Sequence, residues 1–136
     1  MKIFGIGTDI VNIKRMERML KKYGLNFKNK IFSKKEISYC EKKINSSAFY
    51  AKRFAAKEAF SKALGTGIRK GVNLKNIEIS NNIHGKPSIL LKGSLANYLK
   101  KKVENKKYEI YLSLSDDKPW AHATVIISYN IWKIKL

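Results

Sequence analysis

The sequence predicts an α+β fold in which a mostly antiparallel sheet packs against one long helix. Two observations lead to this prediction. Four strand-like segments crowd the second half of the chain with only one helical segment among them, which favours antiparallel pairing over a doubly wound sheet. Residues 48–64 show helical periodicity over a longer stretch than any other helical segment of the chain.

The composition is that of a chain able to form one packed domain. The chain has 136 residues, 44% of them hydrophobic, and no linker rich in proline, glycine or serine divides it. We therefore expect one domain over residues 1–136. No apolar run reaches the length of a membrane span, no secretory signal is visible, and the lone Cys40 excludes an internal disulfide. A cytoplasmic location with no membrane partner is expected.

The N-terminal part of the chain predicts a strand and then a helix. Residues 2–11 are rich in isoleucine and glycine and predict a buried first strand. A helix is expected over 13–23, because Asn12 suits the N-cap and Gly24 suits the end. One face of this helix is basic. It carries Lys14, Arg18, Lys21 and Lys22.

Two further helices are predicted before the strands begin. Ser33 and Glu36 have the spacing of a capping box, which predicts a helix through about Lys43. The long helix over 48–64 is expected to stop at Gly65 and Gly67. The second half then predicts strands over 74–80 and 87–91, a helix over 94–104, and strands over 108–115 and 123–131, with turns at 81–86 and 116–119.

The long helix has two faces of different character. One face should meet the core and carries Phe49, Ala56, Phe60, Ala63 and Leu64, together with Arg53. The opposite face carries Ala51, Phe54, Ala55, Glu58 and Lys62. In a lysine-rich protein a solvent-exposed helix face would carry many charged residues. This face carries mostly small residues, so we expect other protein atoms or a ligand to cover it. Glu58 and Lys62, four residues apart, are neighbours, and a simple helix salt bridge is one interpretation of the pair.

A second acid changes the interpretation of Glu58. Asp9 ends the glycine-flanked stretch Gly5-Ile6-Gly7-Thr8-Asp9, where it is either a turn or cap residue or part of a site. The chain has only 10 acidic residues, and two of them stand at unusual positions among small residues. Carboxylate oxygens are ligands that Mg²⁺ prefers, with phosphates and water completing its shell. Asp9 and Glu58 together therefore indicate a magnesium site.

The net charge of +19 favours an anionic partner. A bias in composition toward lysine, isoleucine and asparagine explains the charge equally well. The charge and the acid pair leave two classes of function open at this point. The charge suits a nucleic-acid-binding module, although Asp9 and Glu58 would repel phosphate without a metal, so we expect no nucleic-acid partner. The acid pair also suits another magnesium-dependent phosphoryl or nucleotidyl enzyme with a different acceptor.

Four motifs resemble the signatures of the holo-[acyl-carrier-protein] synthases. These are residues 5–11, the run Arg-Phe-Ala-Ala-Lys-Glu-Ala-Phe-Ser-Lys-Ala-Leu-Gly-Thr-Gly at 53–67, Gly85-Lys86-Pro87, and Ser113-Leu114-Ser115-Asp116 with 121–127. The resemblance covers nearly the whole chain. At Asp116 the chain departs from the many relatives that carry histidine there.

The resemblance implies a 4'-phosphopantetheinyl transferase fold and a magnesium-dependent enzyme. Such an enzyme moves 4'-phosphopantetheine from coenzyme A to a serine of apo acyl carrier protein, releases adenosine 3',5'-bisphosphate and supports fatty acid biosynthesis. Asp9 and Glu58 would hold Mg²⁺, Glu58 or a water would take the serine proton, and Lys62 would stabilise phosphate charge. Weaker candidates for coenzyme A contacts are Arg53, Lys57, Gly65, Lys86 and Asp116.

The resemblance also implies partners. The short form of the family is a homotrimer with sites between subunits, and a subunit contact would account for the small-residue face of the long helix. Acyl carrier proteins are acidic, so the basic face of the first helix, joined by Arg15, would dock one. A solvated basic face in a lysine-rich protein is the alternative.

Overall fold

The computed structural model describes residues 1–66 and 72–133, and it confirms the α+β fold. The elements in chain order are β1 (Lys2–Asn12), α1 (Ile13–Ile31), α2 (Lys34–Glu41), α3 (Ser46–Leu64), the 3₁₀ turn η2 (Leu74–Asn76), β2 (Ile77–Asn81), β3 (Pro87–Leu91), α4 (Ser94–Lys102), β4 (Lys106–Asp117) and β5 (Trp120–Lys133). None of the helices in these ranges is long and apolar enough to cross a membrane.

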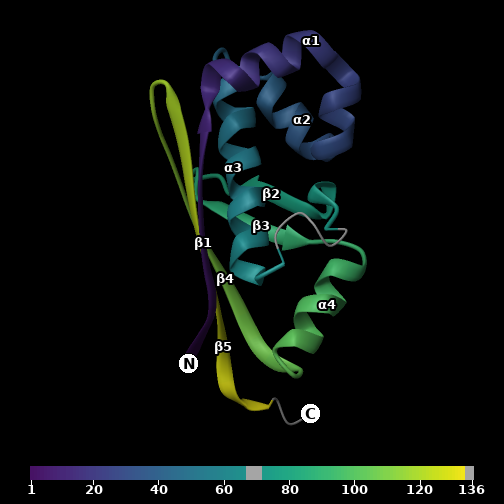
Figure 1. Cartoon of the computed structure of the whole chain (residues 1–136), viewed down its shortest axis with the longest axis vertical. Coiled ribbons are helices and arrows are strands. Elements are labelled where there is room, and N and C mark those ends of the chain that lie inside the picture. The colour runs from purple at the N-terminus through teal and green to yellow at the C-terminus, as the bar shows by residue number, and fades with distance from the viewer. Residues whose placement is uncertain (67–71, 134–136) are drawn as a thin grey trace.

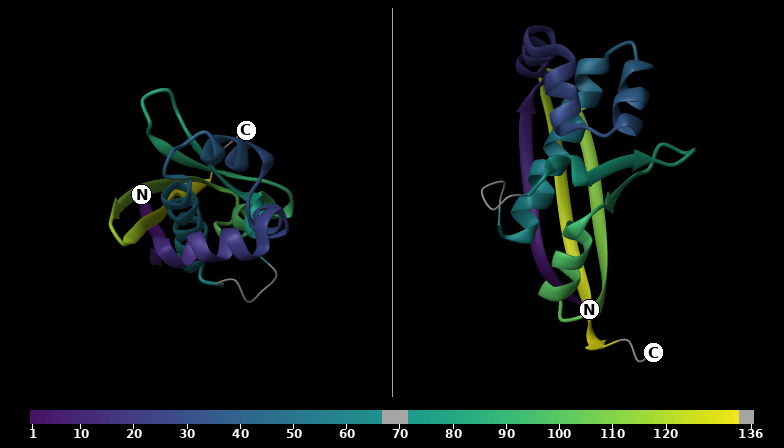
Figure 2. Two further views of the ribbon diagram at one scale, coloured as in Figure 1. Left: turned by 90° about the horizontal axis from the view of Figure 1, so that it is seen from above. Right: turned by 90° about the vertical axis from the view of Figure 1, so that its right-hand side faces the viewer.

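The central element of the structure is a long antiparallel sheet of three strands. Its order is β1-β5-β4, so the first strand of the chain pairs with the last. The long helix α3 runs along one face of this sheet, with α1 and α2 at one end and α4 toward the other (Figure 1). The antiparallel pair β2-β3 forms a hairpin that projects sideways (Figure 2).

The predicted helix ends are confirmed where local capping decides them. The Asn12 side chain accepts a hydrogen bond from the Arg15 backbone N–H at 3.1 Å and starts α1. Ser33 and Glu36 form both bonds of the capping box that opens α2. Gly65 adopts the left-handed conformation, with φ of 88°, and ends α3. Gly67 lies outside the described residues.

Several predicted boundaries differ from the structure, and three regions differ most. Gly24, with φ of 56°, breaks α1 as expected, but a second helical segment continues to Ile31 because its apolar side chains pack against the core. Residues 74–76 form the 3₁₀ turn and not strand, since the Asn73 side chain caps that turn. Strands β4 and β5 run further than predicted, which leaves only 118–119 between them.

The packing of α3 on β1 is unusually close. A Cβ atom at Gly5 would overlap the backbone oxygen of Ala63, and one at Gly7 would overlap that of Ala59. No side chain therefore lies between strand and helix at these two points. Of the small-residue face of α3, Ala51 and Ala55 are fully buried within the chain, whereas Phe54 and Glu58 are half-buried and Lys62 is exposed.

The prediction of a buried first strand is half right. Residues of β1 that face α3 are buried or half-buried, but Ile3, Ile6 and Ile10 are 51%, 61% and 57% exposed. They lie on the face of the sheet away from α3, where residues 1–66 and 72–133 supply no covering layer (Figure 2). In the isolated chain this face is open and partly apolar.

Gly7→Ala is expected to lower the free energy of unfolding by at least about 3 kcal/mol, because the added methyl group meets backbone that cannot move without separating α3 from the sheet. Urea denaturation measures the effect. Thr8→Ala, on the exposed side of the same strand, is the control. Equal stability of the two variants would contradict the close packing.

Candidate active site

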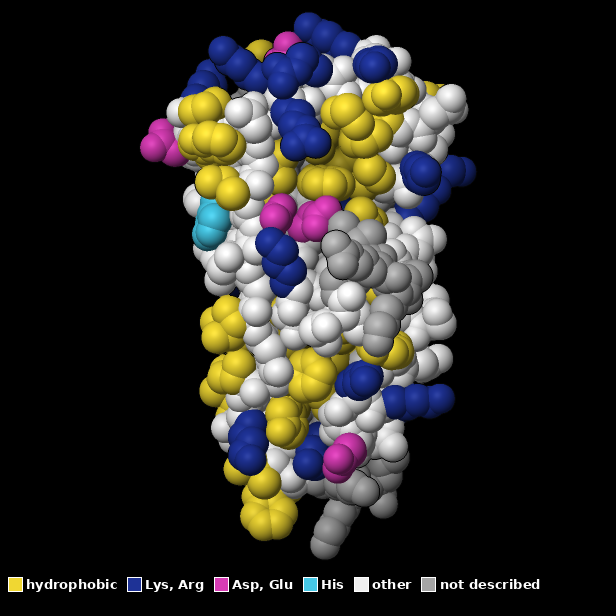
Figure 3. Space-filling view, viewed as in Figure 1, with side chains coloured by type: hydrophobic (Ala, Val, Ile, Leu, Met, Phe, Trp, Pro, Cys, Tyr) yellow, Lys and Arg dark blue, Asp and Glu magenta, His cyan; other side chains and the backbone are white. Residues whose placement is uncertain are grey.

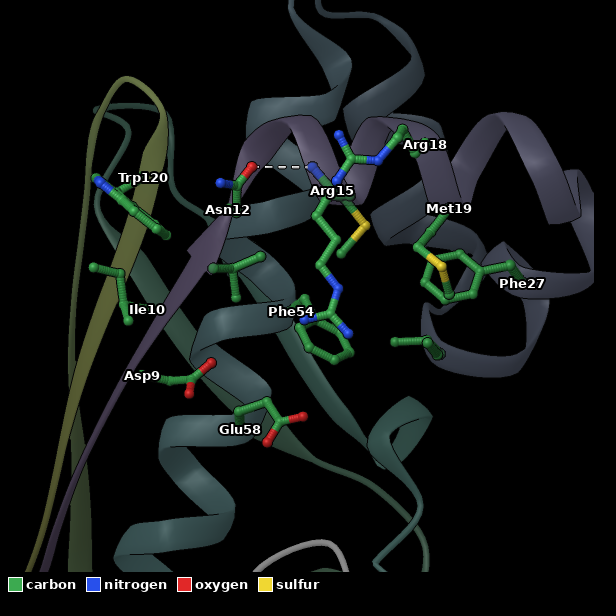
Figure 4. Close-up of a pocket in the computed structure, with 13 residues that line it drawn as sticks. Asp9, Ile10, Asn12, Arg15, Arg18, Met19, Phe27, Phe54, Glu58 and Trp120 are labelled. Carbon is green, nitrogen blue, oxygen red and sulfur yellow. Dashed lines mark hydrogen bonds between the residues drawn. The ribbon is translucent and has the colours of Figure 1, made fainter.

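A large cavity lies where β1, α1 and α3 meet. It has a volume of about 680 Å³ and is lined by Asp9, Ile10, Val11, Asn12, Arg15, Met16, Arg18, Met19, Phe27, Ile31, Phe54, Glu58 and Trp120. Two acids lie at one end of it, arginines of α1 lie at its side, and most of the rest is apolar (Figure 4). The cavity thus offers charged groups at its mouth and room for an apolar chain inside.

The structure brings Asp9 and Glu58 together at this cavity. Asp9 is the next residue after Gly7 on the side of β1 that faces α3, and Glu58 projects from α3 beside it (Figure 4). The space-filling view shows adjoining acidic side chains next to a hydrophobic patch on this face, with basic side chains gathered toward α1 (Figure 3). Burial raises the pKa of Glu58, the negative charge of Asp9 raises it further, and Lys62 opposes both. The two carboxylates are close enough to repel each other.

Lys62 joins the acids from the next turn of α3. Its ammonium donates to Asp9 Oδ1 at 3.1 Å and to the Thr8 backbone oxygen at 3.0 Å, and its side chain is 53% exposed. The ion pair therefore joins helix to strand. Among the ion pairs of the described ranges there is none between Glu58 and Lys62, so the simple helix salt bridge does not explain this motif.

As a cation site, the acid pair is incomplete without a substrate. Within residues 1–66 and 72–133, no group of three or more His, Cys, Asp or Glu side chains is placed to hold a metal. Mg²⁺ is commonly held by one or two carboxylates, with substrate phosphates and water filling its remaining positions. Two carboxylates at an open cavity fit that arrangement.

Arg53 lines a different cavity, of about 170 Å³, on the other side of α3. Tyr39, Phe49, Lys52, Arg53, Asn81, Gly85, Pro87 and Leu114 line it. Arg53 is 2% exposed, donates to Asn81 Oδ1 at 2.7 Å, and its guanidinium lies 4.2 Å from the centre of the Tyr39 ring. These contacts explain why an arginine occupies the core-facing side of the helix. Asp116 pairs with Lys52 at 3.0 Å, and Lys86 stands in the hairpin loop beside this cavity.

Lys57 has a structural environment that does not fit the expected contact with coenzyme A. It is fully buried, and its ammonium donates to Glu36 Oε1 at 2.8 Å and to the backbone oxygens of Leu74 at 2.8 Å and Ile77 at 2.5 Å. All three donors of the ammonium are therefore used inside the fold. Glu36 in turn accepts from the Ile79 backbone N–H at 3.1 Å, so this pair ties α2, α3 and β2 together.

Sequence reasoning missed the side chains whose contacts depend on this tertiary packing. Glu36 was expected only as a capping residue, and Lys52 and Asn81 were not singled out. A signal existed for Lys57, since at 100° per residue it falls near Arg53 on the core-facing side of α3. Gly65 lies at the left-handed end of α3, and a Cβ there would meet nothing within 4 Å.

The basic residues of α1 divide into two groups. Arg15 and Arg18 line the large cavity, on the same side as the acid pair. Lys14, Lys21 and Lys22 are exposed but do not line it, and Lys21 pairs with Glu17 at 3.1 Å. The arginines thus share a cavity with the acid pair, whereas the lysines extend the positive surface of the helix outward.

Comparison with known protein families gives a match that agrees with the fold and with the pair of carboxylates. Residues 5–125 match the family model described as the 4'-phosphopantetheinyl transferase superfamily. The chain belongs to this superfamily, and the resemblance noted from its motifs is confirmed.

Individual relatives narrow the class to the holo-[acyl-carrier-protein] synthases. The chain is 50% identical to that synthase of Wolbachia pipientis subsp. Culex pipiens over 129 residues, covering 92% of this chain and 97% of the relative. The crystal structure of the synthase from Neisseria meningitidis superposes with a TM-score of 0.84 at 38% identity, covering 93% of this chain and 99% of that one. The synthase of Helicobacter pylori, solved in complex with coenzyme A, gives 0.78 at 36% identity, covering 90% and 99%.

Glu58→Gln is expected to raise the melting temperature of the metal-free protein at pH 7. The pKa of Glu58 in the folded state lies above its ordinary value of 4.5, so its contribution to stability is present below that value and lost as the pH rises through the folded-state pKa. At pH 7 the ionised carboxylate is therefore destabilising, and the neutral glutamine removes that effect. Melting curves at several pH values measure it.

The stabilisation should disappear below about pH 4, where Glu58 is protonated in both states. Glu17→Gln, which removes the same charge from the exposed surface of α1, is the control. A stabilisation by Glu58→Gln that is equal at pH 4 and pH 7 would contradict the assignment.

Proposed function

We propose that this protein transfers 4'-phosphopantetheine from coenzyme A to a serine of apo acyl carrier protein, in a Mg²⁺-dependent reaction that releases adenosine 3',5'-bisphosphate. The proposal includes a cytoplasmic location and a role in fatty acid biosynthesis. The observation that carries it is the convergence of Asp9 and Glu58 at one cavity, in a chain whose relatives are holo-[acyl-carrier-protein] synthases, one of them solved in complex with coenzyme A.

Asp9 and Glu58 would hold the Mg²⁺ ion. The fit is supported by the repulsion between the two carboxylates, which a divalent cation relieves. When bound, the ion supplies positive charge that neutralises the diphosphate as its P–O–P bond breaks. Lys62 pairs with Asp9 through one oxygen only, which leaves the second oxygen of Asp9 for a cation.

The side chains around the ion divide the remaining work. Glu58, whose pKa is raised by burial and by the charge of Asp9, is suited to accept the proton of the attacking serine hydroxyl. The exposed ammonium of Lys62 stabilises charge on the phosphates. Arg53, Lys86, Gly65 and Asp116 remain candidates for contacts with the rest of coenzyme A.

The candidate residues form two half-sites on opposite edges of the chain. Asp9 lies on the edge strand β1 and Asp116 near the end of the other edge strand, β4. On α3, Glu58 and Lys62 point away from Phe49 and Arg53, with the helix between them. One coenzyme A molecule that contacts both half-sites therefore needs two chains, and we propose a homotrimer with sites between subunits.

The open face of the sheet supports this assembly. Ile6 and Ile10 of β1 and Tyr111 of β4 are 61%, 57% and 46% exposed on the side away from α3. Apolar patches of this kind mark protein interfaces. A symmetric oligomer would bury this face and place the β1 edge of one subunit beside the β4 edge of the next.

The positive end of the molecule suits an acidic carrier protein. Arg15 and Arg18 lie at the cavity, and Lys14, Lys21 and Lys22 extend the same helix surface. Complementary charge would raise the rate at which the carrier docks with its serine near Asp9 and Glu58. The apolar part of the cavity, including Met16 and Phe54, gives the pantetheine arm a place to lie.

Incubation of the protein with coenzyme A, Mg²⁺ and apo acyl carrier protein should add the mass of phosphopantetheine to the carrier. Asp9→Asn and Glu58→Gln should each lower the rate at least about 100-fold while leaving the fold intact, because each removes a ligand of the ion. Mass spectrometry of the carrier measures the transfer. Glu104→Gln, far along the chain on the exposed surface, is the control. Absence of a mass gain with the unmodified protein would refute the function.

A mixture of two inactive variants should recover activity if the sites lie between subunits. Asp9→Asn damages one half-site and Arg53→Gln the other, so a mixed trimer contains some sites with both halves intact. Random assembly from equal amounts gives about one quarter of the wild-type activity, compared with a few per cent for each variant alone. Steady-state rates after joint refolding measure the recovery, and native mass spectrometry verifies mixed trimers. Mixed trimers without recovery would refute the shared site.

A further inference from the structure

The small cavity beside α3 holds a concentration of positive charge against aromatic rings. The ammonium of Lys52 lies 4.2 Å from the centre of the Phe49 ring, and the Arg53 guanidinium lies 4.2 Å from that of Tyr39. Lys43 lies 4.8 Å from Tyr39 and 5.3 Å from Phe49. Three cations thus share two rings, and the rings hold the cations in place by cation–π attraction.

Arg53 carries a buried charge that the chain leaves uncompensated. It is 2% exposed, and in the part of the chain that the structure describes no carboxylate pairs with it. Within the described residues its one side-chain hydrogen-bond partner is the neutral Asn81, and its Nε atom has no hydrogen-bond partner. A buried cation without a counter-ion is costly, so the site favours an anion from outside the chain.

Lys52 is positioned to meet the same anion. Its side chain is 17% exposed, and one of its three donors is used by Asp116 Oδ1 at 3.0 Å. Lys52 and Arg53 both line the cavity, whereas Asp116 does not. The carboxylate therefore holds the ammonium at the rim without occupying the cavity.

We propose that Lys52 binds a phosphate group of coenzyme A together with Arg53, and that Asp116 acts by holding Lys52 in position. This inference rests on the proposed function and assigns the contact to Lys52, where the sequence pointed to Asp116. A carboxylate facing phosphate alone would repel it. Paired with Lys52, Asp116 fixes a cation that a phosphate can approach.

Lys52→Met should weaken the binding of coenzyme A at least about tenfold, since it removes the ammonium that lies over Phe49 and its charge-assisted hydrogen bond but keeps an unbranched side chain. Lys52→Arg should return the dissociation constant to within about threefold of wild type. Isothermal titration calorimetry measures both. Lys101→Met, which removes an exposed lysine of α4, is the matched control. Wild-type affinity in Lys52→Met, or a loss that Lys52→Arg does not restore, would overturn the proposal.

Coenzyme A offers phosphate at the ribose and at the diphosphate, and dephospho-coenzyme A separates the two. If the cavity holds the ribose phosphate, Lys52→Met should lose affinity for coenzyme A and not for dephospho-coenzyme A. If the cavity holds the diphosphate, the loss should be the same for both ligands. Wild-type protein that binds coenzyme A through Lys52 but transfers nothing would sink the proposed function and leave this site standing.

The role of Asp116 is tested by a double-mutant cycle. Asp116→Asn alone should weaken coenzyme A binding by less than Lys52→Met does, because Lys52 remains. The double variant should bind no more weakly than Lys52→Met alone, since Asp116 acts only through Lys52. Losses that add in full would show that Asp116 contacts the ligand independently and would overturn that part of the proposal.

Discussion

The approach of α3 to β1 is the constraint on which the rest of the structure depends. Glycine at positions 5 and 7 lets the helix backbone rest directly on the strand, with the alanines Ala59 and Ala63 opposite. Asp9, the next residue on the same face of the strand, then falls within reach of the helix turn that carries Glu58 and Lys62. A larger side chain at either glycine would move the helix outward and separate the acids. The geometry of the site is therefore a direct product of backbone packing.

The parts of the fold that the sequence predicted are those decided by local interactions. Asn12, the Ser33–Glu36 pair and Gly65 fix helix ends through bonds to neighbouring backbone, so residue type and spacing were enough to find them. The continuation of α1 to Ile31 was not predictable in this way, because it depends on packing against α2 and α3. The exposure of one face of β1 was not predictable either. Its outward isoleucines are hydrophobic and so predicted a buried strand, because a sequence pattern cannot show whether a second layer covers the sheet.

The candidate site shows the same division. The sequence pointed to Asp9, Glu58 and Lys62 as one group, and the structure places Asp9 and Glu58 at one cavity and pairs Lys62 with Asp9. Lys57, in the same motif, was grouped with the ligand contacts, although its place on the core-facing side of α3 pointed inward. Its partner Glu36 lies 21 residues earlier and was already assigned as a cap, so only tertiary packing could reveal the pair. The separation of Arg53 from Glu58 followed from their positions on the helix, but its meaning required the strand order of the sheet.

The net charge of +19 has two physically distinct sources. Most lysines are exposed, where water and salt screen them, so composition alone is a sufficient account of those. The interior cations are different because screening does not reach them. The buried ammonium of Lys57 pairs with the carboxylate of Glu36. The buried guanidinium of Arg53 has no carboxylate partner among the described residues. A buried cation without a counter-ion lowers the stability of the free protein, and an anionic ligand bound beside Arg53, as proposed, would relieve that cost. The affinity proposed for an anionic ligand would therefore come in part from this buried charge, independent of the long-range field of the surface lysines.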